Sequence, residues 1–283
     1  MMTPPTLPSR SARVKFRLAG GAQPLILVPV RVNGHGPFEF ILDTGAGTSL
    51  LSTALADQLK IKILGSKEGQ SAGGKVTVSL GSIDLIEVGE ARLTSLEVGI
   101  VDLSPIGKTV GARIDGDLGY NFLRHFRVII DYAKGEISFD DPKRVDRINR
   151  TARTEMPLRL ANPAKPLVLV DVYANRSGPF QFVIDTGTST TVVAPQLAKQ
   201  LNLSSSPIGN VTTGGAPVAV TAGVLRSFTV GNATSSDLSV TVADFFAALS
   251  DAVGTKLDGI VGYNFLRDYK VVFDYPNERL TLI

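Results

Sequence analysis

Two copies of the triplet Asp-Thr-Gly are the residues of this chain whose types and spacing could do chemistry. They lie at Asp43-Thr44-Gly45 and Asp185-Thr186-Gly187, and each follows an apolar run that begins with Gly-Pro. A reaction that needs two carboxylates facing each other across a symmetry axis can be built by duplicating one unit that carries a carboxylate. The repeated triplet therefore predicts that Asp43 and Asp185 come together as a pair.

Each triplet lies between a predicted strand and a predicted helix. Residues 38–42 and 180–184 are short apolar runs, which favours strands buried on both faces. Residues 52–59 and 195–201 have helical spacing, with a serine and a proline as start signals. We therefore expect each aspartate at a loop tip between two regular elements, followed by a glycine that allows close backbone approach.

The duplication extends over nearly the whole chain. The motif DGDLGYNFLR at residues 115–124 recurs as DGIVGYNFLR at residues 258–267. The distance along the chain between these two motifs differs by one residue from the distance between the two triplets. We predict an N-terminal lobe over residues 13–140, a basic linker over residues 141–154 and a C-terminal lobe over residues 155–283.

Composition indicates a folded protein rich in strands. The 283 residues are 43% hydrophobic and 19% charged, enough for two cores of domain size, and 28 glycines and 16 prolines separate many short Val, Ile, Thr and Leu runs. The absence of cysteine excludes disulfides and thiolate chemistry.

Charge and hydropathy restrict the partners. The net charge of +3 is mild, and the basic linker lacks interleaved aromatic residues, so we interpret it as a solvated linker and expect no nucleic acid. No apolar run is long enough for a membrane span. The first 22 residues lack the apolar core of a secretory signal, which leaves the compartment open and slightly favours the cytoplasm over the cell envelope.

Other duplicated polar residues receive structural interpretations. Asp115 and Asp258 precede glycine, so we predict that they hydrogen-bond the backbone of their own turns. Asp131 and Asp274 are likewise expected in turns, and Asn121 and Asn264 as caps of the following helices. The two histidines, His35 and His125, have no counterparts in the other copy, which gives no support to a histidine mechanism or a metal site.

The order of motifs within each copy resembles the retropepsin-like aspartic proteases. An apolar run and Asp-Thr-Gly are followed by a glycine-rich segment, at residues 71–76 and 213–218, and then by an apolar-Gly pair, Leu118-Gly119 and Val261-Gly262, before a short helix. The resemblance covers nearly the whole chain, which looks like two fused retropepsin subunits and is similar to pepsin in overall plan.

The resemblance implies an all-β fold of two lobes related by a pseudo-twofold axis, with short helices. It also implies an endopeptidase in which Asp43 and Asp185 are the catalytic dyad and share one proton around a water molecule. One carboxylate would act as general base and the other as general acid, without metal or cofactor. The residues implied to support the dyad are Thr44, Gly45, Thr186, Gly187 and Thr188.

The two copies differ directly after the triplets, where Ala46 corresponds to Thr188. A hydroxyl at this position can donate to a carboxylate, so we predict that Asp185 ionises more readily and that Asp43 holds the proton. The glycine-rich segments resemble flaps that would bind an extended polypeptide by strand addition. Their glycines are Gly73, Gly74, Gly214 and Gly215.

Two other functions are open at this point. A catalytically silent peptide-binding module would keep the same fold, although two intact triplets argue against it. An actin-like or sugar-kinase-like ATPase could use the loop after Asp43 for phosphate, but residues 62–101 and 204–242 predict hairpins where those folds need long helices. The linker favours pairing of the two copies within one chain, and so a monomer.

Overall fold

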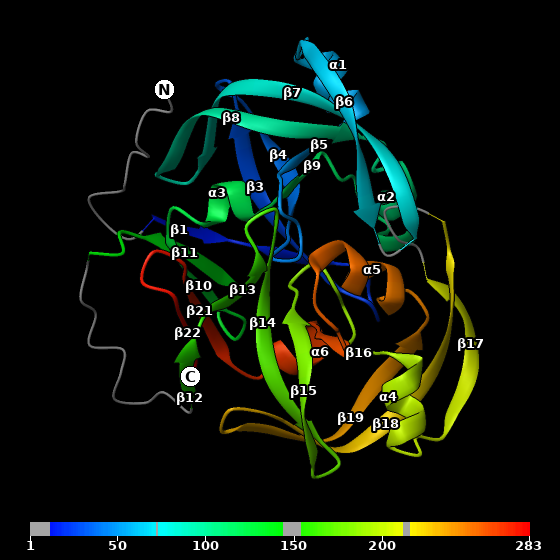
Figure 1. Ribbon diagram of the computed structural model, residues 1–283. Coiled ribbons are helices and arrows are strands. Elements are labelled where there is room, and N and C mark those ends of the chain that lie inside the picture. The colour runs from blue at the N-terminus through cyan, green and yellow to red at the C-terminus, as the bar shows by residue number, and fades with distance from the viewer. Residues whose placement is uncertain (1–11, 72, 144–153, 212–215) are drawn as a thin grey trace.

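Two strand-rich lobes and a sheet between them make up the computed structural model of the protein, which describes residues 12–71, 73–143, 154–211 and 216–283 (Figure 1). The predicted all-β class is confirmed, and the helices in the described part are short. None of those helices has the length and apolarity needed to cross a membrane.

The N-terminal lobe is an eight-stranded sheet with the order β2-β3-β4-β9-β5-β8-β7-β6, closed on itself by an additional pairing of β3 with β7. Its strands are β2 (Arg17–Ala19), β3 (Leu25–Val32), β4 (His35–Leu42), β5 (Leu50–Ser52), β6 (Ile63–Ser71), β7 (Gly74–Val88), β8 (Ala91–Val101) and β9 (Gly116–Leu118). Its helices are α1 (Thr53–Gln58), α2 (Ser104–Val110) and α3 (Tyr120–Leu123).

The C-terminal lobe repeats this sheet strand for strand, with the order β13-β14-β15-β20-β16-β19-β18-β17 and closure by β14 and β18. Its strands are β13 (Arg159–Asn162), β14 (Lys165–Ala174), β15 (Ser177–Ile184), β16 (Val192–Val193), β17 (Ser205–Val211), β18 (Val218–Val230), β19 (Ala233–Ala243) and β20 (Gly259–Val261). Its helices are α4 (Pro195–Gln200), α5 (Phe246–Val253) and α6 (Tyr263–Leu266).

A six-stranded sheet joins the lobes, in the order β1-β11-β10-β21-β22-β12. Its strands are β1 (Ala12–Lys15), β11 (Glu136–Asp140), β10 (Arg127–Asp131), β21 (Lys270–Asp274), β22 (Arg279–Leu282) and β12 (Thr154–Pro157). The lobes meet where β10 pairs antiparallel with β21, with Ile129 opposite Val272. One cluster of buried side chains runs through both lobes and this sheet, so the molecule has a continuous core.

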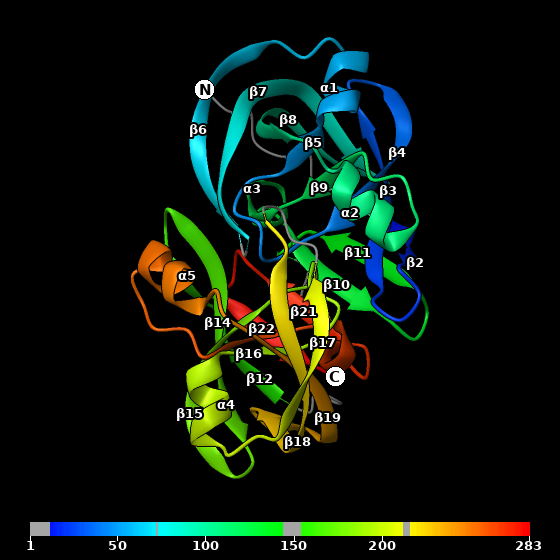
Figure 2. The ribbon, with the colours of Figure 1, turned by 90° about the vertical axis from the view of Figure 1, so that its right-hand side faces the viewer.

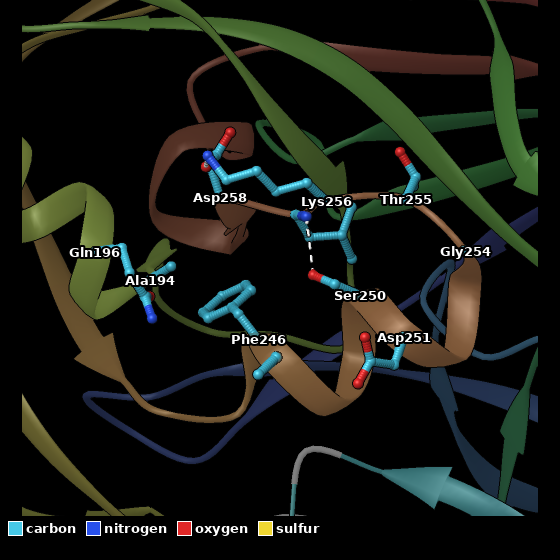
Figure 3. A pocket seen from close by; sticks show the side chains of 11 residues that line it. Ala194, Gln196, Phe246, Ser250, Asp251, Gly254, Thr255, Lys256 and Asp258 are labelled. Carbon is cyan, nitrogen blue, oxygen red and sulfur yellow. Dashed lines mark hydrogen bonds and ion pairs between the residues drawn. The ribbon is translucent and has the colours of Figure 1, made fainter.

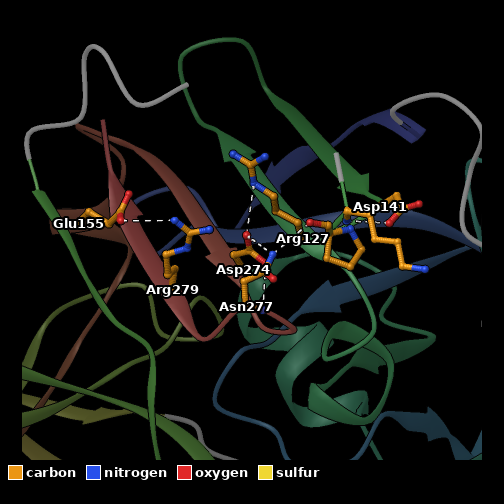
Figure 4. Close-up of polar contacts among 8 residues, drawn as sticks. Arg127, Asp141, Glu155, Asp274, Asn277 and Arg279 are labelled. Atoms are coloured by element: carbon orange, nitrogen blue, oxygen red, sulfur yellow. Dashed lines mark hydrogen bonds and ion pairs between the residues drawn. The ribbon is translucent and has the colours of Figure 1, made fainter. Parts of the chain in front are cut away.

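Polar contacts lie at both ends of the β10–β21 pair, and Figure 4 shows those at the end where Arg127 approaches Asp274. Lys270 Nζ lies 2.9 Å from Asp131 Oδ2 of the other lobe, and at the opposite end Arg127 Nε lies 3.9 Å from Asp274 Oδ2. Asn277 Nδ2 donates to Asp274 and also to the carbonyl of Pro142, at 3.1 Å. The last contact ties the start of the predicted linker to the C-terminal lobe.

The predicted strands and helices beside the triplets form as expected. The buried side chains of β4 lie on both of its faces, as do those of β15. Ser52 Oγ accepts a hydrogen bond from Leu55 N and so caps α1, while Pro195 occupies the first turn of α4. Gly116 and Gly259 leave no room for a side chain. A Cβ at Gly116 would overlap the ring of Phe40, and a Cβ at Gly259 would overlap the ring of Phe182.

The basic linker lies mostly outside the described residues, which stop at residue 143 and resume at residue 154. The predicted lobe boundaries at residues 140 and 155 stay a prediction.

Candidate active site

The two triplets begin where the central strands of the lobes end. Asp43 follows β4, and its backbone N–H donates to the carbonyl of Leu118 in β9 at 3.2 Å. Asp185 follows β15, and its N–H donates to the carbonyl of Val261 in β20 at 3.0 Å. Strand β4 runs parallel to β9, and β15 runs parallel to β20. Each aspartate therefore lies at the carboxyl end of a buried strand pair.

Reciprocal hydrogen bonds between the two threonines bind the loops together across the lobes. Thr44 Oγ1 donates to the carbonyl of Ile184 at 3.1 Å and accepts from the N–H of Thr186 at 3.1 Å. Thr186 Oγ1 donates to the carbonyl of Leu42 at 2.8 Å and accepts from the N–H of Thr44 at 3.1 Å. Each threonine is 1% exposed, so all four bonds lie out of water, where unpaired groups would be costly.

The two glycines bring the carboxyls into register. The N–H of Gly45 donates to Asp43 Oδ1 and that of Gly187 to Asp185 Oδ1, both at 2.7 Å. A Cβ on Gly45 would lie 2.6 Å from Cγ of Asp185, and a Cβ on Gly187 would lie 2.6 Å from Cγ of Asp43. Each carboxyl therefore lies directly against the glycine of the opposite loop, and the two carboxyls are hydrogen-bonded to each other.

Asn121 and Asn264 hold these loops and do not cap helices as predicted. Asn121 lies within α3, and its Oδ1 accepts from both the N–H and the Oγ of Ser49 at 2.8 Å. Asn264 in α6 binds Thr191 in the same way, at 2.7 and 2.9 Å. The caps of these helices are the glycines of the apolar-Gly pairs instead, Gly119 and Gly262.

Burial raises the pKa values of both Asp43 and Asp185 well above the usual range of an aspartate. Desolvation is the main cause at both positions, and the charge of Asp43 adds to it at Asp185. A hydrogen bond from Thr188 Oγ1 to Asp185 Oδ2, at 2.6 Å, acts in the opposite direction and lowers the pKa of Asp185. Two carboxyls in contact cannot readily both ionise, so the pair titrates as a unit with a shared proton.

A family model described as aspartyl protease matches the chain twice, over residues 28–122 and 170–265. The chain belongs to the aspartyl protease family. The two matched segments each contain one Asp-Thr-Gly triplet and one apolar-Gly pair, so the resemblance to the retropepsin-like aspartic proteases is confirmed. No individual curated protein matches the chain significantly.

The regions predicted as flaps of this aspartyl protease are the hairpins β6–β7 and β17–β18, which approach each other from opposite lobes (Figure 2). Gly73 lies in the turn of the first hairpin and Gly74 begins β7, and the carbonyl of Gly73 accepts from the N–H of Ala216 in the second hairpin at 3.0 Å. Gly214 and Gly215 lie outside the described residues. A hollow of about 450 Å³ lies beside these tips, bordered by Pro217 and by Phe245 before α5.

A third carboxyl at the pair was not anticipated from the sequence. Asp117 of β9 is 6% exposed and is hydrogen-bonded to Asp43. The available signal was an acidic residue in the motif DGDLGYNFLR, at the position where the matching motif DGIVGYNFLR has Ile260. Among the described residues, no group of three or more His, Cys, Asp or Glu side chains is arranged to hold a metal ion.

The other duplicated carboxylates accept hydrogen bonds from backbone N–H groups of their own lobes. Asp115 Oδ2 accepts from the N–H of Glu39, and Asp258 Oδ2 accepts from the N–H of Gln181, both at 3.0 Å. The prediction that they bond their own turns was wrong, because their partners lie on the neighbouring strands β4 and β15. Asp131 and Asp274 do accept from backbone N–H groups in their own turns, as expected.

A separate hollow of about 610 Å³ opens in the C-terminal lobe between α4 and α5 (Figure 3). Among the residues that line it, Asp258 pairs with Lys256 at 2.6 Å, and Ser250 Oγ accepts from Leu257 N at 3.0 Å. These groups therefore stabilise the local fold, and the paired aspartates lie elsewhere.

Proposed function

We propose that this protein is an aspartic endopeptidase that hydrolyses peptide bonds with water activated between Asp43 and Asp185. The observation that carries the proposal is the reciprocal threonine network, which presses each carboxyl against the glycine of the opposite loop. Such a network holds two carboxyls in contact although like charges repel each other. Membership of the aspartyl protease family supports the same function.

The two aspartates have different roles in the proposed reaction. The hydroxyl of Thr188 stabilises the ionised form of Asp185, whereas Asp43 has the methyl group of Ala46 at the corresponding place. Asp185 accordingly acts as general base. It takes a proton from the water while the oxygen of the water bonds to the peptide carbonyl carbon. Asp43 gives its proton to the carbonyl oxygen, and proton transfer to the amide nitrogen then allows the C–N bond to break.

The substrate class proposed is an extended polypeptide. The hairpins β6–β7 and β17–β18 offer backbone groups near their joined tips, and an extended chain can pair with such groups as an added strand. The hollow beside the tips is bordered mainly by small and apolar residues, which suits apolar side chains. We propose that Gly73 and Gly74 at the tip of the first hairpin contribute to substrate binding, and the same role for Gly214 and Gly215, which lie outside the described residues, stays a prediction.

Cleavage of a denatured protein and of a mixed peptide library, measured from pH 3 to 8, tests this function. The wild type should cleave, and both Asp43→Asn and Asp185→Asn should lose activity by about 10³-fold or more, since each removes half of a unit that acts together. Asp57→Asn is the matched control, because this exposed aspartate lies in α1 and should keep full activity.

Mixing the two inactive variants tests whether the lobes pair within one chain. We propose a monomer, in which each variant carries one defective pair, so a mixture stays inactive. Recovery of activity would indicate exchange of lobes between chains. Absence of cleavage by a folded wild type at every pH would favour the silent peptide-binding module, and peptide affinity would then be the quantity to measure.

A further inference from the structure

The two halves of the site complete the hydrogen bonding of their aspartates with different residues. In the C-terminal lobe, Thr188 Oγ1 donates to Asp185 Oδ2 at 2.6 Å while Gly187 N–H occupies Oδ1. In the N-terminal lobe, Gly45 N–H donates to Asp43 Oδ1, but the residue after Gly45 is Ala46, whose methyl side chain has no hydrogen-bond donor. The N-terminal half therefore needs a partner for Asp43 from another element.

Asp117 occupies the position from which such a partner can reach Asp43. Its strand, β9, lies between β4 and β5, and Asp117 is opposite Ile41 on one side and Leu50 on the other. The adjoining carbonyl of Leu118 holds the backbone of Asp43 itself. The side chain of Asp117 thus lies beside the loop tip and is hydrogen-bonded to the Asp43 carboxyl.

Burial of Asp117 is costly, and nothing in the fold alone requires it. The residue is 6% exposed, and its Oδ1 has no hydrogen-bond partner among the described residues. At the equivalent place in the C-terminal lobe, opposite Val183 and Val192, the chain has Ile260. An aliphatic side chain therefore fits this strand, and the carboxyl is present for its contact with Asp43.

We propose that Asp117 is a positioning residue that orients the carboxyl of Asp43 and shares a proton with it, in the place that Thr188 takes at Asp185. The inference rests on the proposed protease function. A hydrogen bond between two carboxyls requires a proton on one of them, so Asp185, Asp43 and Asp117 form a row that must retain protons. Unlike the threonine hydroxyl, this partner titrates.

The electrostatics of the row support this role. Burial, together with the nearby Asp185, raises the pKa of Asp117 to about 8, although its hydrogen bond with Asp43 lowers it. After burial, the charge of Asp117 and its hydrogen bond are the next causes that raise the pKa of Asp43. The carboxyls that act on Asp117 are those of Asp43 and Asp185. Its other neighbouring strand, β5, consists of Leu50, Leu51 and Ser52 and has no ionisable side chain.

Replacement of Asp117 by the residue of the other lobe, Asp117→Ile, tests the proposal. We expect kcat to fall by about tenfold or more, because Asp43 loses the partner that orients it. The pKa of Asp43 falls as well, so the second ionisation of the pair, and with it the alkaline limb of the kcat/KM profile, moves to lower pH. The conservative variant Ile260→Val at the equivalent position is the control and should change neither quantity.

Rescue separates positioning from titration. Adding Ala46→Thr to Asp117→Ile supplies Asp43 with the hydroxyl that Asp185 has, so kcat should return to within about threefold of the wild type while the alkaline limb stays shifted. Failure of this rescue in a folded double variant, or wild-type kcat and pH limits in Asp117→Ile, would overturn the proposal. If Asp117→Ile does not fold, Asp117→Asn keeps the shape and tests the same shift of the alkaline limb.

A stability measurement distinguishes failure of this inference from failure of the protease function. A carboxyl whose pKa is raised in the folded state stabilises the fold below its unfolded pKa of about 4, and this contribution is lost as the pH rises towards about 8. The free energy of unfolding should therefore fall from pH 4 to 8 more steeply in the wild type than in Asp117→Ile. Equal slopes would contradict the coupling of Asp117 to the pair, whether or not the protein cleaves peptides.

Discussion

At the scale of single residues, Thr188 sets the difference between the two aspartates. Its hydrogen bond lowers the pKa of Asp185, against the effects of burial and of the neighbouring Asp43 that raise it. Thr188→Ala removes the bond, so the lower apparent pKa of the kcat/KM profile should rise. Thr188→Ser keeps the hydroxyl and is the control. An acid limb that does not move in Thr188→Ala would contradict the assignment of Asp185 as the base.

Two buried tyrosines of the C-terminal half offer a second test at this scale. The hydroxyl of Tyr269 donates to the carbonyl of Thr234 at 3.2 Å, whereas that of Tyr275 has no hydrogen-bond partner among the described residues. We expect Tyr269→Phe to lower the free energy of unfolding by about 1 kcal/mol and Tyr275→Phe to leave it within about 0.5 kcal/mol or to raise it. Denaturant titration measures both, and a larger loss for Tyr275→Phe would contradict the prediction.

The residue scale also shows how far sequence reasoning reached. The repeated triplet is sufficient to find Asp43 and Asp185, because both copies have the same residues in the same order. Asp117 was not predicted, because the other copy has an isoleucine at the equivalent position. Only the position of β9 beside the loop tip shows that the side chain of Asp117 meets Asp43. Asn121 was assigned to the wrong partner, since Ser49 becomes its neighbour only through the fold.

At the scale of elements, the close approach of the two loops depends on Gly45 and Gly187. A Cβ at Gly45 would lie 2.6 Å from Cγ of Asp185, so Gly45→Ala forces the loops apart and breaks the threonine network. We expect Gly45→Ala to lose peptide cleavage by about 10²-fold or more and to lower the melting temperature. The control is Gly65→Ala in β6, where a Cβ meets no atom within 4 Å. Comparable effects of the two substitutions would argue against steric separation of the loops.

Most elements near the site could be predicted, and the reason is local. Gly-Pro, an apolar run and a helix start signal follow one another within about twenty residues on each side, and β4, α1, β15 and α4 form there. Helices α2 and α5 were not predicted. Helix α2 (SPIGKTV) begins with a serine and a proline, but it has only seven residues and contains a glycine, and α5 (FAALSDAV) has no side chain that caps its start. Both instead end at a glycine in the left-handed conformation, Gly111 and Gly254.

At the scale of the whole molecule, the sheet that joins the lobes depends on the end of the described chain. Strand β22 pairs with both β21 and β12, and Leu280 and Leu282 are completely buried. Deleting residues 280–283 should lower the free energy of unfolding by about 3 kcal/mol or more, since two leucine side chains lose their burial. It should also reduce activity, because the lobes lose part of the sheet that aligns them.

The control for this truncation is Arg279→Ala, which changes an exposed side chain of the same strand and keeps its backbone. Its free energy of unfolding should stay within about 0.5 kcal/mol of the wild type. Normal stability and activity in the truncated chain would contradict the joining role of β22. The pairing of β10 with β21 at the centre of this sheet was not predicted, because no local pattern shows which two strands of a duplicated chain will be neighbours.

Because the two lobes of one chain differ in sequence, the two directions in which a peptide could bind are not equivalent. A peptide has an amino and a carboxyl end, and a site with perfect twofold symmetry would accept it equally well in either polarity. Here Ala46 takes the position that corresponds to Thr188, and Asp117 the position that corresponds to Ile260, so reversing a bound peptide would exchange two different surroundings of its scissile bond. The molecule therefore has a built-in orientation, which a pair of identical subunits could acquire only after binding.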